Sequence, residues 1–238
     1  MDIKLHFIEK GSGYPLILLH GNGESSGYFE HQTEFFSDRY RVIAVDTRGH
    51  GQSPRGTADF TITQFAEDLH DLLDELSIEC ADILGFSDGA NIALTFAMKY
   101  PKYVNKLVLN GGNLFPQGVK PSVQIPIIIG YHLTKLFPKA KHNHELLSLM
   151  VNEPNIDPNV LHSLNIPTLV IAGKHDMIKE KHTRLIAESI PSAQLKIIEG
   201  THFIAHDSPD EFNRAVEEFL KATPHNSANK FSQIKLNA

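Results

Sequence analysis

The sequence predicts an α/β protein with a mostly parallel central sheet, helices on both faces and a small inserted lid. Short apolar segments alternate with amphipathic helical segments along most of the chain, which is the pattern of βαβ units. Several of the short segments are apolar at every position, as expected of strands that helices cover on both faces. One long, proline-rich segment, residues 112–162, interrupts this alternation.

Seven segments have the length and composition of strands. The first alternates apolar and polar residues and indicates a half-exposed strand, whereas the second and third are continuous apolar runs. The expected strands are residues 4–9, 15–19, 41–45, 81–84, 106–109, 168–172 and 195–198.

Helices are expected between these strands and at the end of the core. Apolar residues recur at helical spacing over residues 62–76 and 90–100, and Pro101 lies just beyond the second segment. Ser208 and Pro209 are typical of an N-cap and a first helical position. The helix that follows is expected to turn four apolar side chains inward: Phe212, Val216, Phe219 and Leu220.

The alternation divides the chain into a core and an insertion. Residues 1–111 and 163–223 form the predicted core, because the strand-like segments fall within them. Residues 112–162 separate two core strands by more than an ordinary connection, and they contain helix-like pieces at 127–136 and 144–151. They are predicted to form a small lid over the sheet. Residues 224–238 are polar and are expected to be a flexible tail.

Composition restricts the class of protein. The chain has 238 residues, of which 41% are hydrophobic and 21% are charged, as in an ordinary globular protein. A net charge of −6 favours neither nucleic acid nor a membrane as a partner. One cysteine, Cys80, cannot form an internal disulfide. Without a signal-like or membrane-spanning segment, we expect a cytoplasmic monomer or homodimer that acts on a small molecule.

The strongest chemical motif is Gly85-Phe86-Ser87-Asp88-Gly89, which has the G-x-S-x-G pattern between an expected strand and an expected helix. In such a turn the backbone is strained and holds the serine at the tip, and the flanking glycines avoid clashes between neighbouring Cβ atoms. Ser87 is therefore a candidate nucleophile. The alternative is an ordinary serine in a glycine-flanked turn.

A second motif, His20-Gly21-Asn22-Gly23, follows an expected buried strand. An acyl-transfer enzyme stabilises the oxyanion of its tetrahedral intermediate with two backbone N–H groups, one of them from the residue after the nucleophile. The backbone amides of Asn22 and Asp88 are the candidate donors. The alternative is a simple glycine turn after a strand.

Two further residues complete a candidate catalytic triad. Asp176 and His202 each follow an expected strand, at the edge of the sheet where open α/β folds place their sites. A histidine would accept the proton of the serine hydroxyl, and an aspartate would orient the imidazole. The order Ser87, Asp176, His202 along the chain is the order found in α/β-hydrolases.

With these motifs the chain resembles the α/β-hydrolase superfamily, of the serine esterase and C–C hydrolase type. The resemblance covers about residues 3–220 and includes the D-x-R-G-x-G-x-S segment at residues 46–53, where Arg48 and His50 are expected to be structural. It implies the α/β-hydrolase fold, no cofactor, and a cap where residues 112–162 lie, although this insertion is short for a cap. The Ser-Asp-Gly sequence and Lys99-Tyr-Pro are similar to valacyclovir hydrolase (biphenyl hydrolase-like protein).

The resemblance leaves the substrate open. In valacyclovir hydrolase the aspartate equivalent to Asp88 binds the amine of an amino-acid ester, so an amino-acid ester is one expectation here. The alternative is that Asp88 turns away and forms hydrogen bonds with lid or backbone groups. A C–C hydrolase of the meta-cleavage-product type and a ligand receptor without turnover are the competing functions.

The predicted lid holds an apolar set and a basic set of side chains. The apolar set either lines an acyl or leaving-group pocket, with Phe115 and Ile128 as candidate substrate contacts, or packs the lid on the core. Its members are Leu114, Phe115, Ile125, Ile127, Ile128, Ile129, Leu133 and Phe137. The basic set attracts an acidic substrate group or is simply solvated, and its members are Lys135, Lys139, Lys141, His142 and His144. Its histidines lack helical metal-ligand spacing, so no metal site is expected.

Overall fold

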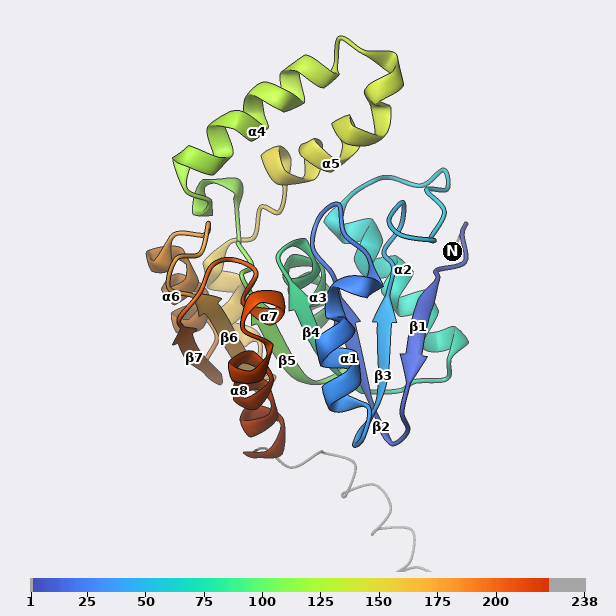
Figure 1. Cartoon of the computed structure of the whole chain (residues 1–238), viewed down its shortest axis with the longest axis vertical. Helices are drawn as coiled ribbons and strands as arrows, with labels where there is room; N and C mark the ends of the chain where they lie inside the picture. Colours follow the sequence, from blue (N-terminus) through green and yellow to red (C-terminus); the bar gives the residue numbers. More distant parts are fainter. Residues whose placement is uncertain (1, 223–238) are drawn as a thin grey trace, which may run out of the picture.

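The computed structural model describes residues 2–222, whose centre is a seven-stranded sheet with the strand order β1-β3-β2-β4-β5-β6-β7 (Figure 1). β1 pairs antiparallel with β3, and every other neighbouring pair is parallel. The strands are β1 (Phe7–Lys10), β2 (Tyr14–Leu19), β3 (Tyr40–Val45), β4 (Ala81–Phe86), β5 (Val104–Asn110), β6 (Thr168–Gly173) and β7 (Ala193–Ile198).

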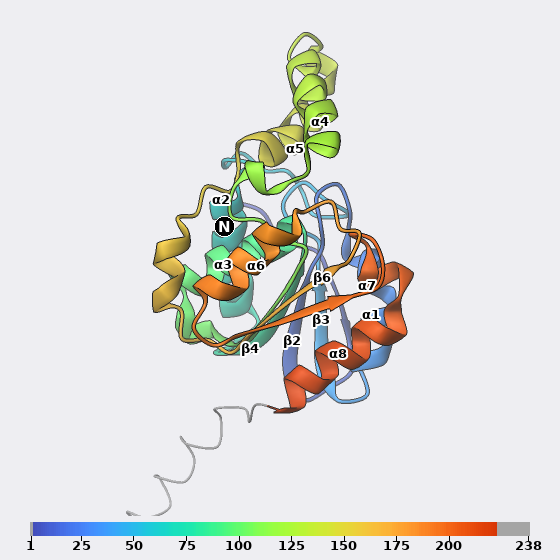
Figure 2. The same cartoon turned by 90° about the vertical axis from the view of Figure 1, so that its left-hand side faces the viewer.

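Helices cover both faces of this sheet, as the side view shows (Figure 2). α2 (Ile62–Glu75), α3 (Asp88–Lys99) and α6 (Glu180–Ser189) lie on one face. α1 (Glu30–Phe36) and α8 (Pro209–Ala222) lie on the other, and the short α7 (Ile204–Asp207) precedes α8. The architecture confirms the predicted α/β fold with a mostly parallel sheet.

The two hydrophobic cores follow from the two-residue repeat of the strands. In β2, Ile17 and Leu19 are buried against the layer that contains α2 and α3, whereas Leu16 and Leu18 are buried against the layer that contains α1 and α8. All four side chains are 0–1% exposed. Such a strand is apolar at every position because both of its faces are covered, which explains the continuous apolar runs in the sequence.

Every strand and core helix expected from the sequence is present, with shifted ends. The inward residues expected in α8 (Phe212, Val216, Phe219 and Leu220) are all buried. The sequence reasoning missed α1 and α6. Both are short, at 7 and 10 residues, and α6 carries only one fully buried apolar side chain, Ile186. The tail predicted at residues 224–238 lies outside the described residues.

The segment between β5 and β6 carries two helices that project beyond the carboxyl edge of the sheet (Figure 1). They are α4 (Pro121–Thr134) and α5 (Lys141–Asn152). α4 begins and ends before the piece expected at 127–136, whereas α5 extends beyond the piece expected at 144–151 at both ends. Pro121 is the first residue of α4, a position where its missing N–H costs no hydrogen bond. No helix within residues 2–222 is both long and apolar enough to span a bilayer.

The loop after β3 is fixed by a buried ion pair. Arg48 donates two hydrogen bonds of 2.7 Å to the carboxylate of Asp68 on α2, and both side chains are nearly inaccessible to solvent. Arg48 also contacts Asp2 at 2.6 Å. These contacts agree with the structural role expected for Arg48, because they join the N-terminus, this loop and α2.

Two buried histidines serve as hydrogen-bond acceptors for the backbone. The Leu114 N–H donates to Nε2 of His182 at 2.9 Å, and the Thr47 N–H donates to Nε2 of His20 at 3.1 Å. Burial lowers the pKa of each imidazole to about 4. Both rings are therefore neutral in the folded protein near pH 7, and protonation would remove the acceptor atom.

His182 makes stability depend on pH. Its pKa in the folded protein lies below the unfolded value, so its contribution is complete above about pH 6.5 and is lost as the pH falls toward 4. We expect this residue to remove about 2 kcal/mol from the free energy of unfolding between pH 7 and pH 5. In His182→Gln, which keeps an acceptor, urea unfolding at the two pH values should show a smaller loss.

The matched control is His175→Gln, because the His175 side chain is 66% exposed. This variant should keep the wild-type difference between pH 7 and pH 5. An unchanged difference in His182→Gln would contradict the assignment of the acid sensitivity to His182.

Candidate active site

Ser87 lies in a strained turn between β4 and α3. Its backbone has φ 54° and ψ −118°, in the left-handed half of conformational space that non-glycine residues rarely occupy. A Cβ atom on Gly85 would lie 2.2 Å from the Gly89 carbonyl oxygen, and one on Gly89 would lie 1.9 Å from the Leu19 carbonyl oxygen. Both glycines are therefore required for α3 to begin this close to β4 and β2.

His202 and Asp176 lie next to this serine at the carboxyl edge of the sheet. Nε2 of His202 is 3.0 Å from Oγ of Ser87, and Nδ1 of His202 is 2.7 Å from Oδ1 of Asp176. The Ile178 N–H also donates to Oδ1 of Asp176, at 2.8 Å, which fixes the carboxylate. His202 is 4% exposed and Asp176 is 3% exposed. The structure thus brings together the three side chains predicted from separate parts of the sequence.

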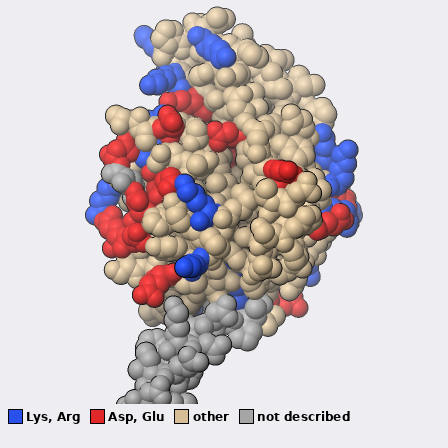
Figure 3. All heavy atoms as spheres, turned by 180° about the vertical axis from the view of Figure 1, so that it is seen from behind, with Lys and Arg blue, Asp and Glu red and all other residues tan. Residues whose placement is uncertain are grey.

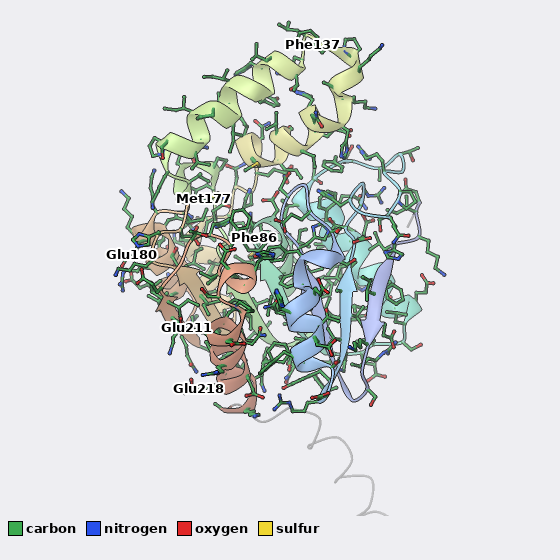
Figure 4. All side chains as sticks on the ribbon, viewed as in Figure 1. Phe86, Phe137, Met177, Glu180, Glu211 and Glu218 are labelled. Carbon is green, nitrogen blue, oxygen red and sulfur yellow. The ribbon has the colours of Figure 1, made fainter. Side chains whose placement is uncertain are left out.

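Residues that the sequence reasoning missed hold the imidazole in place. A Cβ atom on Gly111, which follows β5, would lie 2.8 Å from Cε1 of His202. The ring of Phe86, at the centre of Figure 4, has its centroid 4.8 Å from that of His202 and stacks on Tyr28 at 4.4 Å. The glycine allows the ring to approach β5, and the aromatic side chains shield its other side from water.

The loop after β2 passes close to the serine. A Cβ atom on Gly21 would lie 3.0 Å from the ring of Phe86 and 3.2 Å from Cβ of Ser87. Within residues 2–222, the backbone N–H groups of Asn22 and Asp88 donate no hydrogen bond to another protein group. Both backbone N–H groups therefore remain the candidate oxyanion donors.

The carboxylate of Asp88 is held by two asparagine side chains. Nδ2 of Asn22 donates to its Oδ2 at 2.8 Å, and Nδ2 of Asn91 donates to its Oδ1 at 3.2 Å. Nδ2 of Asn22 also donates to the Leu146 carbonyl of α5 at 3.0 Å, so it joins this site to the insertion. Burial raises the pKa of Asp88, and the two amide donors oppose that shift.

A cavity of about 20 Å³, which is room for about one water molecule, lies between Ser87 and the insertion. Asp88 and Glu153 bring two carboxyl groups to its wall, and no lysine or arginine lines it. Burial raises the pKa of Glu153, and the charge of Asp88 raises it further. The remaining lining residues are Asn113, Val119, Gln124, Ile127, Met150, Met177 and Ile178.

The two apolar substrate contacts expected from the sequence do not line this cavity. Phe115 packs edge-on against His182, with ring centroids 4.6 Å apart, and Ile127 occupies the wall in place of Ile128. The difference has a simple cause, because helical phase decides which of three consecutive isoleucines faces inward. Glu153 was also missed, since a lone glutamate before a proline has no distinctive spacing.

Another carboxyl group, that of Glu24, lies near the imidazole. Burial raises its pKa to about 7, and the nearby charges of His202 and His206 partly oppose that shift. Its Oε2 atom is buried without a hydrogen-bond partner in the described part of the chain. Glu24 directly follows the Gly21–Gly23 turn, and no sequence pattern marked it.

A cavity of about 540 Å³ is a groove at the opposite edge of the sheet. Val104 and Pro167, at the starts of β5 and β6, lie in it, and no titratable side chain lines it. The groove therefore offers no side chain for acid–base chemistry. Within residues 2–222 no group of three or more potential metal ligands is present.

Comparisons with known proteins agree with this geometry. Residues 14–127 match the family described as alpha/beta hydrolase fold. The mouse serine hydrolase BPHL is 29% identical over 92% of this chain and 84% of its own length. A thermophilic esterase from Thermogutta terrifontis (24% identity, TM-score 0.78) covers 92% of this chain and 94% of its own. The meta-cleavage product hydrolase CumD from Pseudomonas fluorescens has the same identity and TM-score over 92% and 95%.

The chain has the α/β-hydrolase fold, and the strand order, the strained serine turn and these matches support an α/β-hydrolase superfamily member with hydrolase activity. Within that superfamily it is similar to the BPHL serine hydrolases of mouse and man.

The close approach of α3 to the sheet makes a sharp prediction for Gly89→Ala. The added methyl group would overlap the Leu19 backbone, which cannot move without breaking β2, so the free energy of unfolding should fall by about 3 kcal/mol or more. Urea unfolding followed by circular dichroism measures this. In the control Gly27→Ala the nearest atom to the new Cβ is 3.5 Å away, and stability should change little. Equal stability of the two variants would contradict the prediction.

Proposed function

We propose that this protein is a cofactor-independent serine hydrolase that cleaves a small carboxylic ester through an acyl-enzyme intermediate. The observation that carries the proposal is the continuous chain of hydrogen bonds from Ser87 to His202 and from His202 to Asp176. A serine hydroxyl is a weak nucleophile, and an adjacent base is what activates it.

Acylation uses each of these groups. As Oγ of Ser87 attacks the ester carbonyl carbon, Nε2 of His202 accepts the hydroxyl proton, and the Asp176 carboxylate stabilises the imidazolium. The negative carbonyl oxygen of the tetrahedral intermediate accepts hydrogen bonds from the backbone N–H groups of Asn22 and Asp88. Collapse of the intermediate breaks the C–O bond, and His202 returns the proton to the departing alcohol.

Deacylation repeats these steps with water. His202 accepts a proton from a water molecule that attacks the acyl carbon, and the second intermediate collapses to the carboxylic acid. Ser87 leaves with the proton from His202, so the enzyme returns to its initial state. The 20 Å³ cavity holds no more than about one water molecule, so a substrate requires the insertion to move away from Ser87.

Two side-chain contacts join the start of α5 to the core. Arg55 donates hydrogen bonds of 2.9 and 3.1 Å to the carboxylate of Glu145 on α5, and Asn22 donates to the Leu146 carbonyl. Both contacts are on α5 rather than α4. Opening of the insertion therefore requires that the start of α5 separates from these two side chains.

Replacement of the nucleophile or the base tests the proposal. Ser87→Ala and His202→Ala should each lower kcat for p-nitrophenyl acetate or butyrate by about 10⁴-fold or more, because the groups act as a unit. A fluorophosphonate should label the wild-type protein and not Ser87→Ala. Ser122→Ala, at an exposed position in α4, is the control and should retain both activities. Wild-type turnover that survives in Ser87→Ala would reject the mechanism.

The two carboxyl groups in the cavity favour a cationic substrate. Asp88 and Glu153 flank the nucleophile, and a negative charge there opposes a developing oxyanion unless a positive group compensates it. The ammonium of an amino-acid ester would supply that charge near the acyl carbon. The asparagine contacts of Asp88 leave lone pairs on both of its oxygens, so they do not prevent such an interaction.

An alanyl ester and its propionyl counterpart differ only in this ammonium group. We expect a higher kcat/KM for the alanyl ester, with the ratio falling about ten-fold or more in Asp88→Asn. Because burial raises the pKa of both carboxyl groups, the preference should be weakest in acid and should increase with pH while the amine stays protonated. Glu180→Gln, an exposed control on α6, should keep the ratio. Equal rates for the two esters would reject the amine specificity and leave ester hydrolysis standing.

The competing functions are separable by the same assays. Ring-cleavage products carry carboxylates, which Asp88 and Glu153 would repel, so C–C hydrolysis is less favoured by this cavity. A receptor on this fold would be labelled slowly by a fluorophosphonate and would turn over simple esters poorly.

A further inference from the structure

One face of the insertion exposes a continuous row of large apolar side chains. They recur at helical spacing along α4 and continue into the turn after it, with 52–72% of each side chain exposed. We call this row the lid apolar face, and its members are Ile125, Ile129, Leu133, Leu136 and Phe137. The sequence predicted that the apolar lid residues line a pocket or pack on the core. Four of them are exposed instead: Ile125, Ile129, Leu133 and Phe137.

This exposure is concentrated in one place. Of the eight large apolar side chains exposed among residues 2–222, five belong to the lid apolar face. α4 is apolar on most sides and yet none of its 14 residues is fully buried. A helix of this composition is ordinarily covered, so the exposed row indicates a surface that binds something.

The charge around the row is positive. Between Asp88 and Glu145 the sequence contains no acidic residue, although the chain as a whole has a net charge of −6. Lys135, Lys139 and Lys141 are exposed at the far end of the lid. Figure 3 shows lysine side chains and no acidic ones at that tip, whereas acidic residues gather over the body of the molecule.

The shape of the surface suits a flat partner. In Figures 1 and 2, α4 and the turn after it form one extremity of the molecule, beyond the core. Figure 4 places Phe137 at the outermost end. A flat surface can therefore contact the whole row without contacting the core. The partner does not need a groove.

We propose that the lid apolar face docks on an anionic lipid bilayer. An apolar stripe of isoleucine, leucine and phenylalanine beside lysines is the composition of helices that lie in a membrane interface. The sequence composition predicted no membrane partner. That prediction used the net charge of the whole chain and the absence of a spanning segment, and neither of these reveals a local basic surface or an exposed apolar face. α4 has 14 residues, too few to span, so it lies along the surface.

A second copy of the chain fits this surface less well. In a symmetric dimer through the lid apolar face, Lys135, Lys139 and Lys141 of both copies would border the same interface. Their like charges oppose such pairing, whereas anionic headgroups attract them.

Co-sedimentation with vesicles tests the proposal. The intact protein should bind phosphatidylglycerol–phosphatidylcholine vesicles, bind pure phosphatidylcholine weakly, and lose binding as salt increases. The combined variant Lys135→Gln, Lys139→Gln, Lys141→Gln should reduce partitioning about 100-fold at low salt, since each lysine near an anionic surface contributes about five-fold. Combined Leu133→Ser, Leu136→Ser, Phe137→Ser should abolish detectable binding, since each buried side chain contributes about ten-fold.

Two controls separate docking from folding and catalysis. Val160→Ser removes a similarly exposed apolar side chain that does not belong to the lid apolar face and should bind like the wild type. Ser87→Ala should also bind like the wild type, so docking can succeed or fail independently of the proposed hydrolysis. The lid variants should keep the wild-type Tm, because the altered side chains are exposed.

Two results would overturn the proposal. One is equal binding to both kinds of vesicle, or no binding to either. The other is sedimentation velocity showing a dimer that the Leu133, Leu136 and Phe137 substitutions convert to a monomer, without vesicle binding. That second result would assign the lid apolar face to another copy of the chain.

Discussion

The contact on which the site depends is the close approach of the first turn of α3 to the ends of β2 and β4. Gly85 and Gly89 allow it, because a Cβ atom on either would overlap backbone atoms. With α3 this close, Ser87 is held with a positive φ at the tip of the turn, and its hydroxyl reaches His202 at 3.0 Å. The strain at this serine is therefore supported by packing that the rest of the sheet supplies.

Electrostatics around this serine are dominated by carboxyl groups. Asp176 contacts the imidazole, whereas the buried Asp88 and the half-buried Glu153 and Glu24 lie nearby, and desolvation raises the pKa of each of these three. Burying several acids near a nucleophile is unfavourable for an anionic transition state unless a cation binds there or the acids stay protonated. The site thus differs from a plain ester-cleaving centre in the charge that it offers to a substrate.

The insertion has two chemically distinct sides. Toward Ser87 it contributes Ile127 and Glu153 to a cavity of about 20 Å³, and Arg55 and Asn22 hold α5 in place. Away from the core it exposes the lid apolar face with its lysines. Because α4 carries both sides, any surface that binds the outer side also acts on the element that covers the nucleophile.

The sequence by itself determined the fold class and predicted the three side chains that meet at Ser87, because buried strands have continuous apolar runs and glycine-flanked turns mark Ser87. Local pattern also located Asp176 and His202 at strand ends. Only the tertiary structure decided that Ile127 rather than Ile128 lines the cavity, since that depends on how α4 packs against α5 and the core. The same packing turned Phe137 outward, and no local pattern records which side of an apolar helix stays uncovered.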